Sequence, residues 1–212
     1  MNTSFTTLSP VMENINTTPP EACLAGCSFP LTKGDFFQML NYGSEGNFVH
    51  LKYGGYWDYT PEAIWEIYRD FAEPVSECLE AVGKLGVKVI NQFKKNDLQK
   101  IREYKVFTLI AHYDYQKDEV DFFDGIIGKY NFVQVFPADF GGIIDLTLCN
   151  AVFIRNELRN KLGNRILSFN AELPIIQSLL LYKQVINNLK RFEINYIDCY
   201  TKTILDLKKT VP

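Results

Sequence analysis

The chain has 212 residues and a mass of 24.4 kDa, which is enough for one large domain and too little for two substantial ones. Apolar residues make up 47% and charged residues 22%, an ordinary globular composition that excludes a chain disordered throughout. The net charge is −3 and the basic residues are scattered along the sequence, so nucleic acid is not expected as a main partner.

Cysteine content and apolar run length indicate the compartment. An odd number of cysteines, at low density, does not fit a secreted fold held by disulfides, so a reducing, cytoplasmic compartment is expected. The longest apolar stretches, 106–111 and 179–182, are far shorter than the roughly 20 residues that cross a bilayer. No membrane contact is expected. The five cysteines are Cys23, Cys27, Cys78, Cys149 and Cys199.

The first elements follow a polar segment. Residues 1–31 are rich in Thr, Ser, Asn and Pro without a sustained period, which predicts a loosely ordered leader before a single domain over 32–212. A short helix is expected over 34–40 and a strand over 47–53. Thr60-Pro61-Glu62 is typical of a helix start.

Two helices are expected from this start to residue 93. The first would end at Pro74 because proline breaks a helix, and the second follows the apolar stripe from Val75 to Phe93. Asp97 would cap a short helix that ends near Tyr104.

Strands dominate the middle of the sequence. The run 106–111 is almost continuously apolar, which indicates a strand buried on both faces. Residues 118–124 alternate up to Gly125 and predict a hairpin, and 137–142 reads as a loop. Residues 143–149 form a second buried strand.

The last third alternates helix and strand. A helix is expected to end at Gly163, a strand to cover 165–169, and two helices to run from Asn170 to about Arg191 and over 196–208. This element order predicts an α/β three-layer sandwich with a mostly parallel central sheet.

Two reactive side chains follow the two buried strands. His112 comes directly after the strand 106–111, and Cys149 closes the strand 143–149. The chain has only two histidines, so a histidine directly after a buried strand is less expected by chance. If the strands are parallel neighbours, both side chains lie at the same sheet edge. There an imidazole can take the thiol proton and leave a reactive thiolate.

The order of these residues resembles a known family. A strand that ends in His112, followed 37 positions later by Cys149 at the end of Asp145-Leu146-Thr147-Leu148, is similar to the caspase-fold cysteine peptidases. The layout is closest to the CHAT branch, and the resemblance covers roughly residues 45–192 in element order.

The resemblance implies a cysteine endopeptidase without a cofactor. Cys149 would attack a peptide carbonyl, His112 would be the general base, and backbone N–H groups near Tyr113 and at Cys149 would hold the oxyanion. Asp145 and Thr147 become the substrate-binding candidates. Relatives that prefer a basic P1 residue carry an acid at the position of Thr147, so that position does not predict a basic preference.

The sequence also departs from the family. Members usually have glycine after the histidine, where this chain has Tyr113, and Asn150-Ala151 replaces a small or glycine-containing turn. A catalytically inactive protein-interaction module and an unrelated α/β small-molecule binder therefore stay open. The partner would be a peptide or protein substrate, with regulation by the leader or by another protein.

Other reactive groups predict no metal site. Asp114, Asp121 and Asp124 straddle the predicted hairpin without the spacing of a calcium loop, which favours a solvated acidic loop. Cys23 and Cys27 have the spacing of half a zinc site, but no second pair follows them. Taken singly, a buried cysteine or histidine is more often structural than catalytic.

Overall fold

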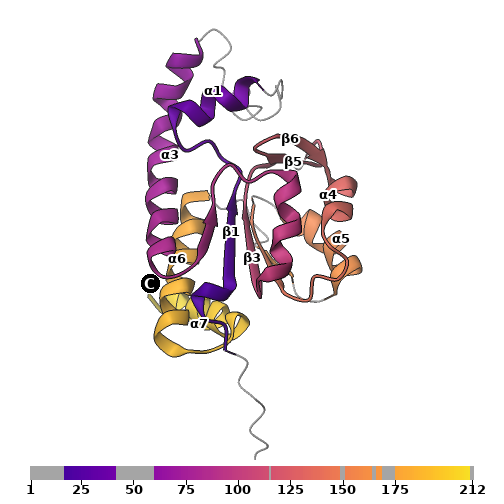
Figure 1. Cartoon of the computed structure of the whole chain (residues 1–212). Helices are drawn as coiled ribbons and strands as arrows, with labels where there is room; N and C mark the ends of the chain where they lie inside the picture. Colours follow the sequence, from indigo (N-terminus) through magenta and orange to yellow (C-terminus); the bar gives the residue numbers. More distant parts are fainter. Residues whose placement is uncertain are drawn as a thin grey trace, which may run out of the picture.

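A five-stranded parallel sheet with helices on both faces forms the centre of the molecule (Figure 1). The computed structural model describes residues 17–41, 60–114, 116–148, 151–163, 166–168 and 175–210. In spatial order the strands are β2 (Lys88–Ile90), β1 (Cys23–Cys27), β3 (Val106–Ile110), β7 (Ile143–Thr147) and β8 (Ile166–Ser168). The prediction of an α/β three-layer sandwich with a mostly parallel sheet is confirmed.

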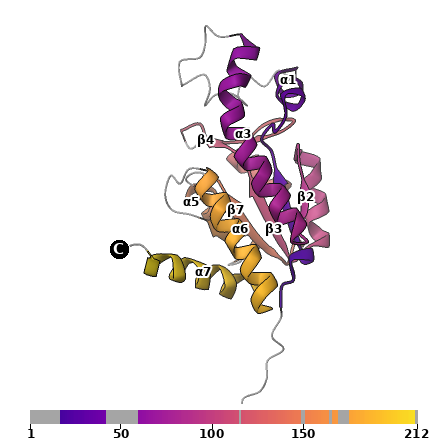
Figure 2. The ribbon, with the colours of Figure 1, turned by 90° about the vertical axis from the view of Figure 1, so that its left-hand side faces the viewer.

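One face of the sheet is covered by three helices, α3 (Pro61–Lys84), α6 (Ile175–Phe192) and α7 (Tyr196–Thr210). Figure 2 shows α3 and α6 running side by side across this face, with α7 beside the end of α6. Successive strand residues point to opposite faces. Cys23, Ala25 and Cys27 therefore point to this layer from β1, and Val106 and Ile110 from β3.

The opposite face is more uniformly apolar. It is covered by the 3-10 helix η3 (Lys95–Glu103), α4 (Lys129–Val135) and α5 (Val152–Leu162). Their buried side chains pack against Phe107 and Leu109 of β3 and Leu146 of β7. Both central strands are thus buried on both sides, as expected for a parallel sheet.

A second, smaller sheet follows β3 directly. It is antiparallel and contains β4 (Tyr113–Asp114), β5 (Glu119–Phe122) and β6 (Gly125–Gly128). It lies near the carboxyl ends of the parallel strands, beneath α1 (Lys33–Asn41) in Figure 1. Phe123 of this hairpin packs with Phe36 of α1 and Trp65 of α3. The predicted hairpin after the central strand is confirmed, and the structure adds β4 and α4 to it.

The prediction of a loose leader over residues 1–31 is wrong for its second half. A single turn of 3-10 helix, η1 (Pro20–Ala22), leads into β1, which pairs with both β2 and β3. All five residues of β1 are buried. The strand is too short to show a period, and its Ala and Gly residues have weak strand propensity. Pairing with β3 on one side and β2 on the other makes it a strand.

A single helix replaces the two expected on either side of Pro74. α3 continues through Pro74, and Thr60 caps its start by accepting a hydrogen bond from the Ala63 N–H at 3.3 Å. An internal proline costs about 3 kcal/mol, whereas each buried large apolar side chain contributes about 1.5–3 kcal/mol. The buried stripe on both sides of the proline outweighs that cost, with Tyr68, Val75, Leu79 and Val82 among its members.

The end of α3 also differs from the prediction. The apolar stripe to Phe93 predicts helix, but α3 ends at Lys84 and residues 88–90 form β2. Gly86 has φ +115°, a conformation that glycine adopts without strain. This turn redirects the chain into the sheet. The strand expected over 47–53 lies outside the described residues.

The later elements agree with the sequence. α5 ends before Gly163, whose φ is +84°, β8 lies within 165–169, and α6 and α7 occupy the two expected helical segments. Within the part of the chain that the structure describes, no helix has both the length and the apolar character needed to span a membrane.

We expect Gly26→Ala to destabilise the protein because β1 leaves no room for a methyl group there. A Cβ at Gly26 would lie 2.6 Å from the Phe93 ring, which must then move. The cost of such overpacking is about 1–3 kcal/mol, to be measured as the free energy of unfolding in urea. Gly83→Ala is the matched control, since its Cβ would lie 3.7 Å from Val89 and alanine favours a helix. Equal stability of the Gly26 variant and the parent would contradict this packing.

Candidate functional site

The candidate site lies where β3 and β7 end, at the carboxyl edge of the larger sheet. The two strands are parallel neighbours, with Ile110 opposite Thr147 in their register. His112 follows Ile110 by two positions in the sequence, and Cys149 follows Thr147 by the same number. Cys149 and Asn150 themselves lie outside the described residues. The structure thus places His112 and fixes where the strand leading to Cys149 ends.

His112 joins β3 to the smaller sheet. Its carbonyl oxygen accepts a hydrogen bond of 3.0 Å from the N–H of Asp121, and the pairing continues with Tyr113 opposite Val120. Hydrogen-bonded and non-hydrogen-bonded pairs alternate along an antiparallel ladder. The pair beside the one formed by His112 and Asp121 is therefore not hydrogen-bonded, and the N–H of Tyr113 points away from β5.

Tyr113 is held by its side chain. The ring is 1% exposed, and its hydroxyl donates a hydrogen bond of 2.7 Å to Asp118, which also accepts one of 2.8 Å from Lys129. Tyr113 lies in an extended strand and is not among the non-glycine residues with positive φ. A side chain at this position, where the resembled family has glycine, therefore needs no strained backbone here.

The environment of His112 favours a neutral imidazole. Burial lowers the pKa of His112 below its usual 6.5, because a charged ring loses hydration, and the negative charge of Asp114 partly opposes this effect. A neutral imidazole near pH 7 can accept a proton, which is the property that a general base needs.

Phe93 ties the hairpin to the end of β1. Its N–H donates to the carbonyl of Cys27 at 2.8 Å, and its own carbonyl accepts from the N–H of Phe123 at 3.0 Å and from the Ser28 hydroxyl at 3.3 Å. Asp124 adds a link from the hairpin to the start of η3, since it accepts a hydrogen bond of 3.1 Å from the Lys95 N–H. The hairpin that follows His112 is therefore hydrogen-bonded both to Phe93, next to the end of β1, and to Lys95 at the start of η3.

Asp121 corrects the prediction of a solvated acidic loop. Its side chain is only 5% exposed, whereas Asp114 and Asp124 are half-buried. The alternation of 118–124 predicts one buried face, which Val120 and Phe122 occupy. The sequence pattern does not show that the face with Asp121 and Phe123 is buried as well. Phe123 packs there against α1 and α3, which are distant along the chain.

The structure does not bring Asp145 or Thr147 out at the edge as substrate contacts. Each is 3% exposed, and both point to the sheet face that α6 and α7 cover. Asp145 lies in the middle of β7, opposite Thr108 of β3, and accepts a hydrogen bond of 2.5 Å from the Tyr196 hydroxyl. Asp145 and Thr147 thus share one face of β7, and that face is interior.

The carboxyl group of Asp145 is strongly affected by this burial. Loss of hydration raises its pKa from 3.8 to about 6, and the hydrogen bond from Tyr196 lowers it in part. Asp145 therefore loses its proton near pH 6 in the folded state and near pH 4 in the unfolded state.

Asp145 should make the protein less stable as pH rises from about 4 to 6. The folded state holds the proton more tightly, so this stabilisation is complete below the unfolded pKa and is lost as pH passes the folded value of about 6. At about 1.4 kcal/mol for each tenfold difference in proton affinity, the loss is roughly 3 kcal/mol.

Urea unfolding of the parent and of Asp145→Asn at pH values from 4 to 7 measures this effect. The difference in unfolding free energy between the two proteins should change across the window, because the amide does not titrate. Asp139→Asn, at a surface ion pair with Arg102, is the control and should leave the pH dependence nearly unchanged. Parallel curves for the parent and Asp145→Asn would contradict the assignment.

The four described cysteines have poorly reactive environments. Burial raises the pKa of Cys23 and Cys27 to about 12 and that of Cys199 to about 11, and it also raises the pKa of Cys78. All four are free thiols. Cys23 and Cys27 lie on the same strand, β1, all of which is buried. Among the described residues, no three His, Cys, Asp or Glu side chains are grouped so that they could hold a metal ion.

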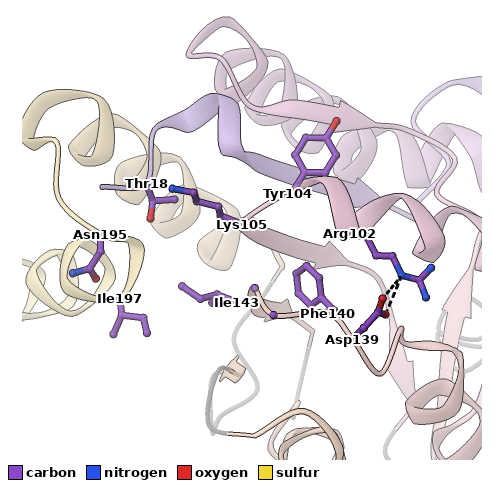
Figure 3. A pocket seen from close by; sticks show the side chains of 11 residues that line it. Thr18, Arg102, Tyr104, Lys105, Asp139, Phe140, Ile143, Asn195 and Ile197 are labelled. Carbon is purple, nitrogen blue, oxygen red and sulfur yellow. Dashed lines mark hydrogen bonds and ion pairs between the residues drawn. The ribbon is translucent and has the colours of Figure 1, made fainter. Parts of the chain in front are cut away.

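A cleft at the opposite end of the sheet was not predicted. It has a volume of about 630 Å³ and lies at the amino ends of β3 and β7 (Figure 3). Lys105, Tyr104 and Asn195 line it, together with Arg102, which donates two hydrogen bonds to Asp139 at 3.0 and 3.2 Å. Gly141 and Gly142 also line the cleft, but nothing in their sequence pattern predicts a cavity there. The cleft shares no residue with the His112 edge.

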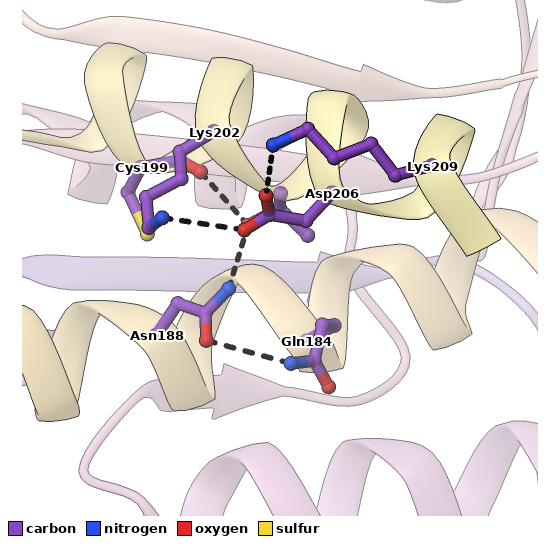
Figure 4. Close-up of polar contacts among 7 residues, drawn as sticks. Gln184, Asn188, Cys199, Lys202, Asp206 and Lys209 are labelled. Carbon is purple, nitrogen blue, oxygen red and sulfur yellow. Dashed lines mark hydrogen bonds and ion pairs between the residues drawn. The ribbon is translucent and has the colours of Figure 1, made fainter.

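A groove of about 740 Å³ lies between α6 and α7. Polar contacts lie along it: Asn188 donates a hydrogen bond of 2.9 Å to the Thr203 hydroxyl, and Asp206, which also lines the groove, pairs with Lys202 and Lys209 (Figure 4). Large apolar side chains with substantial exposure gather on the same two helices: Leu180, Phe192, Ile197, Leu205 and Leu207.

Comparison of the chain with models of protein families, with curated proteins and with solved structures gives no match. The chemistry of the site is therefore argued from the residues themselves.

Proposed function

We propose that this protein is a cysteine endopeptidase of the caspase-like, CHAT type, with Cys149 as nucleophile and His112 as general base. The observation that carries the proposal is the register of β3 and β7, in which the strands leading to the two residues end side by side. The half-buried, neutral imidazole of His112 supports the same assignment. Parallel sheets commonly place their sites at this edge.

The proposed reaction proceeds in two steps. His112 takes the proton from the Cys149 thiol, and the thiolate attacks the carbonyl carbon of the scissile peptide bond. As the tetrahedral intermediate collapses, the C–N bond breaks, and His112 returns the proton to the leaving amine. A water molecule then attacks the thioester while His112 accepts its proton. The carboxylic acid product leaves, and the thiol of Cys149 is restored.

The backbone N–H of Tyr113 is the proposed oxyanion donor, together with that of Cys149. Its direction away from β5 supports this role, since an oxyanion needs a fixed donor outside the hairpin ladder. The substrate is a peptide or protein. A reducing compartment such as the cytoplasm would keep Cys149 as a thiol.

Cys149 should react with iodoacetamide at pH 7 much faster than the other cysteines. A base beside Cys149 promotes thiolate formation, whereas burial holds the pKa of Cys23, Cys27 and Cys199 at about 11 or above. We expect at least about a tenfold difference in rate, measured by mass spectrometry of tryptic peptides. His112→Ala should slow the labelling of Cys149 without changing the others.

Activity provides the second readout. Cys149→Ala should abolish cleavage of a peptide library, whereas Cys199→Ala, a buried thiol outside the edge, should retain it in a folded protein. Equal, slow labelling of all cysteines would overturn the peptidase proposal. Loss of activity in both variants with an intact fold would also argue against Cys149 as the nucleophile.

A second candidate function, a protein-interaction module, is favoured by the α6–α7 groove. Monomeric proteins seldom expose several large apolar side chains side by side without a partner. Leu180 is 57% exposed and Leu207 is 45% exposed, and both line the groove. An amphipathic helix can bind by laying its apolar face into an apolar groove of this kind.

The charge of the two helices indicates an acidic partner. Residues 175–210 contain six basic and three acidic residues, in a chain whose net charge is −3. Lys183 and Arg191 line the groove, while Asp206 is already paired with Lys202 and Lys209. We propose that the occupant is an amphipathic helix of another protein with acidic residues beside its apolar stripe. The same surface of a second copy would meet like charge.

A synthetic helical peptide with Leu at i, i+4 and i+7 and Glu on the flanking positions should bind, as measured by fluorescence anisotropy. The double variant Lys183→Glu, Arg191→Glu should bind at least about tenfold more weakly, because it removes the complementary charge. Leu180→Ser should also lose binding, and Ile67→Ser on α3 is the matched control for an exposed apolar side chain. Equal binding of a Lys-flanked peptide, or a dimer that Leu180→Ser dissociates, would overturn the acidic-helix proposal.

A further inference from the structure

Asp121 lies directly opposite His112 across the antiparallel pairing that joins β3 to the hairpin. The hydrogen bond from the Asp121 N–H to the His112 carbonyl continues the β4–β5 register, in which Tyr113 faces Val120 and Asp114 faces Glu119. Residues directly opposite in such a pair send their side chains to the same face, with Cβ atoms about 4.5–5.5 Å apart. The carboxyl group of Asp121 and the imidazole of His112 are therefore neighbours on one face of the hairpin.

The burial of Asp121 is not explained by any hydrogen bond of its carboxyl oxygen Oδ2. Within the part of the chain that the structure describes, Oδ2 is buried without a hydrogen-bond partner. Buried carboxyl oxygens in native proteins nearly always have such a partner or a functional reason to lack one. The His112 ring does not donate to Oδ2 in this structure either. Because the two side chains leave from opposed strand positions, a change of side-chain rotamer would let a ring nitrogen become the missing partner.

The other acids on this face do not compete for the same role. Asp114 is half-buried and already accepts hydrogen bonds from the N–H groups of Gln116 at 2.9 Å and Lys117 at 3.2 Å. Glu119 is half-buried and lies opposite Asp114 rather than His112. Asp121 is the acid of this face that is both buried and in register with the histidine.

We infer that Asp121 is a positioning residue for His112, whose carboxyl group holds one ring nitrogen and directs the other toward the sheet edge. The inference rests on the proposed function, because it treats His112 as the base. A base that is held by a third group keeps the tautomer and orientation that proton transfer needs. When Asp121 is ionised and His112 takes the thiol proton, the Asp121 carboxylate stabilises the imidazolium that forms.

The pKa shifts of Asp121 and His112 are those expected of two groups that share a proton. Burial, together with the negative charges of Glu119 and Asp114, raises the pKa of Asp121 to about 8, and Lys117 partly opposes this rise. Burial lowers the pKa of His112. Two adjacent groups with these opposite tendencies are expected to titrate as a pair that holds one proton near neutral pH. The form with an Asp121 carboxylate beside a neutral His112 therefore gains population as pH rises toward about 8.

Asp121→Asn tests the pairing by NMR titration of the His112 ring. Two histidines are present, so a His50→Gln variant assigns the signals. We expect the titration of the His112 ring to move down by about one pH unit or more in Asp121→Asn, because the ring no longer shares the proton that the pair holds. Asp114→Asn and Glu119→Gln are the matched controls on the same face and should produce smaller changes. An unchanged His112 titration in Asp121→Asn overturns the inference.

A measurement on the parent protein covers the case in which Asp121→Asn does not fold. In protein labelled with ¹³C at the aspartate carboxyl carbons, the Asp121 signal should show a step at the same pH as the His112 ring. Independent steps would overturn the pairing.

Peptidase assays separate this inference from the function on which it rests. In an active enzyme, Asp121→Asn should lower kcat by about 100-fold or more with little change in KM, as for a base that loses its orienting group. A paired titration without activity in any variant would reject the peptidase and keep the pairing. Cys149-dependent activity that Asp121→Asn leaves intact would reject the positioning role and keep the peptidase.

Discussion

The parallel pairing of β3 with β7 is the constraint on which the rest of the arrangement depends. Five consecutive residues of each strand are in register, from Val106 opposite Ile143 to Ile110 opposite Thr147. Slipping this register by one residue would turn every buried side chain to the other face, so the two cores hold it firmly. The loops after both strands therefore start at the same level, and that level defines the candidate site.

The two faces of the sheet have different chemistry. The face under η3, α4 and α5 is apolar, and Phe93 links it to the hairpin through backbone hydrogen bonds. The face under α3, α6 and α7 contains Asp145 with its Tyr196 partner and the poorly reactive thiols. Buried polar groups in this interior affect stability. They lie apart from the polar groups around His112, at the edge where we propose that the chemistry takes place.

Much of this fold could be predicted from local patterns. The apolar run 106–111, the helix end at Gly163 and the hairpin turn at Gly125 depend on residues close in sequence, and each is confirmed. Predictions failed where distant contacts outweigh local preference. Proline at 74 lowers helix propensity, but the packing of α3 against α1 and α6 keeps the helix intact across it.

The sequence by itself determined the α/β class, the two buried central strands, and the spacing that puts a histidine and a cysteine after them. Only the tertiary structure decided that Cys23–Cys27 is the strand between β2 and β3, that Asp145 faces the interior, and that Asp121 is buried opposite His112. Periodicity reports which side of an element is apolar. The element that covers that side, and the residue that faces another across a ladder, depend on segments far apart along the chain.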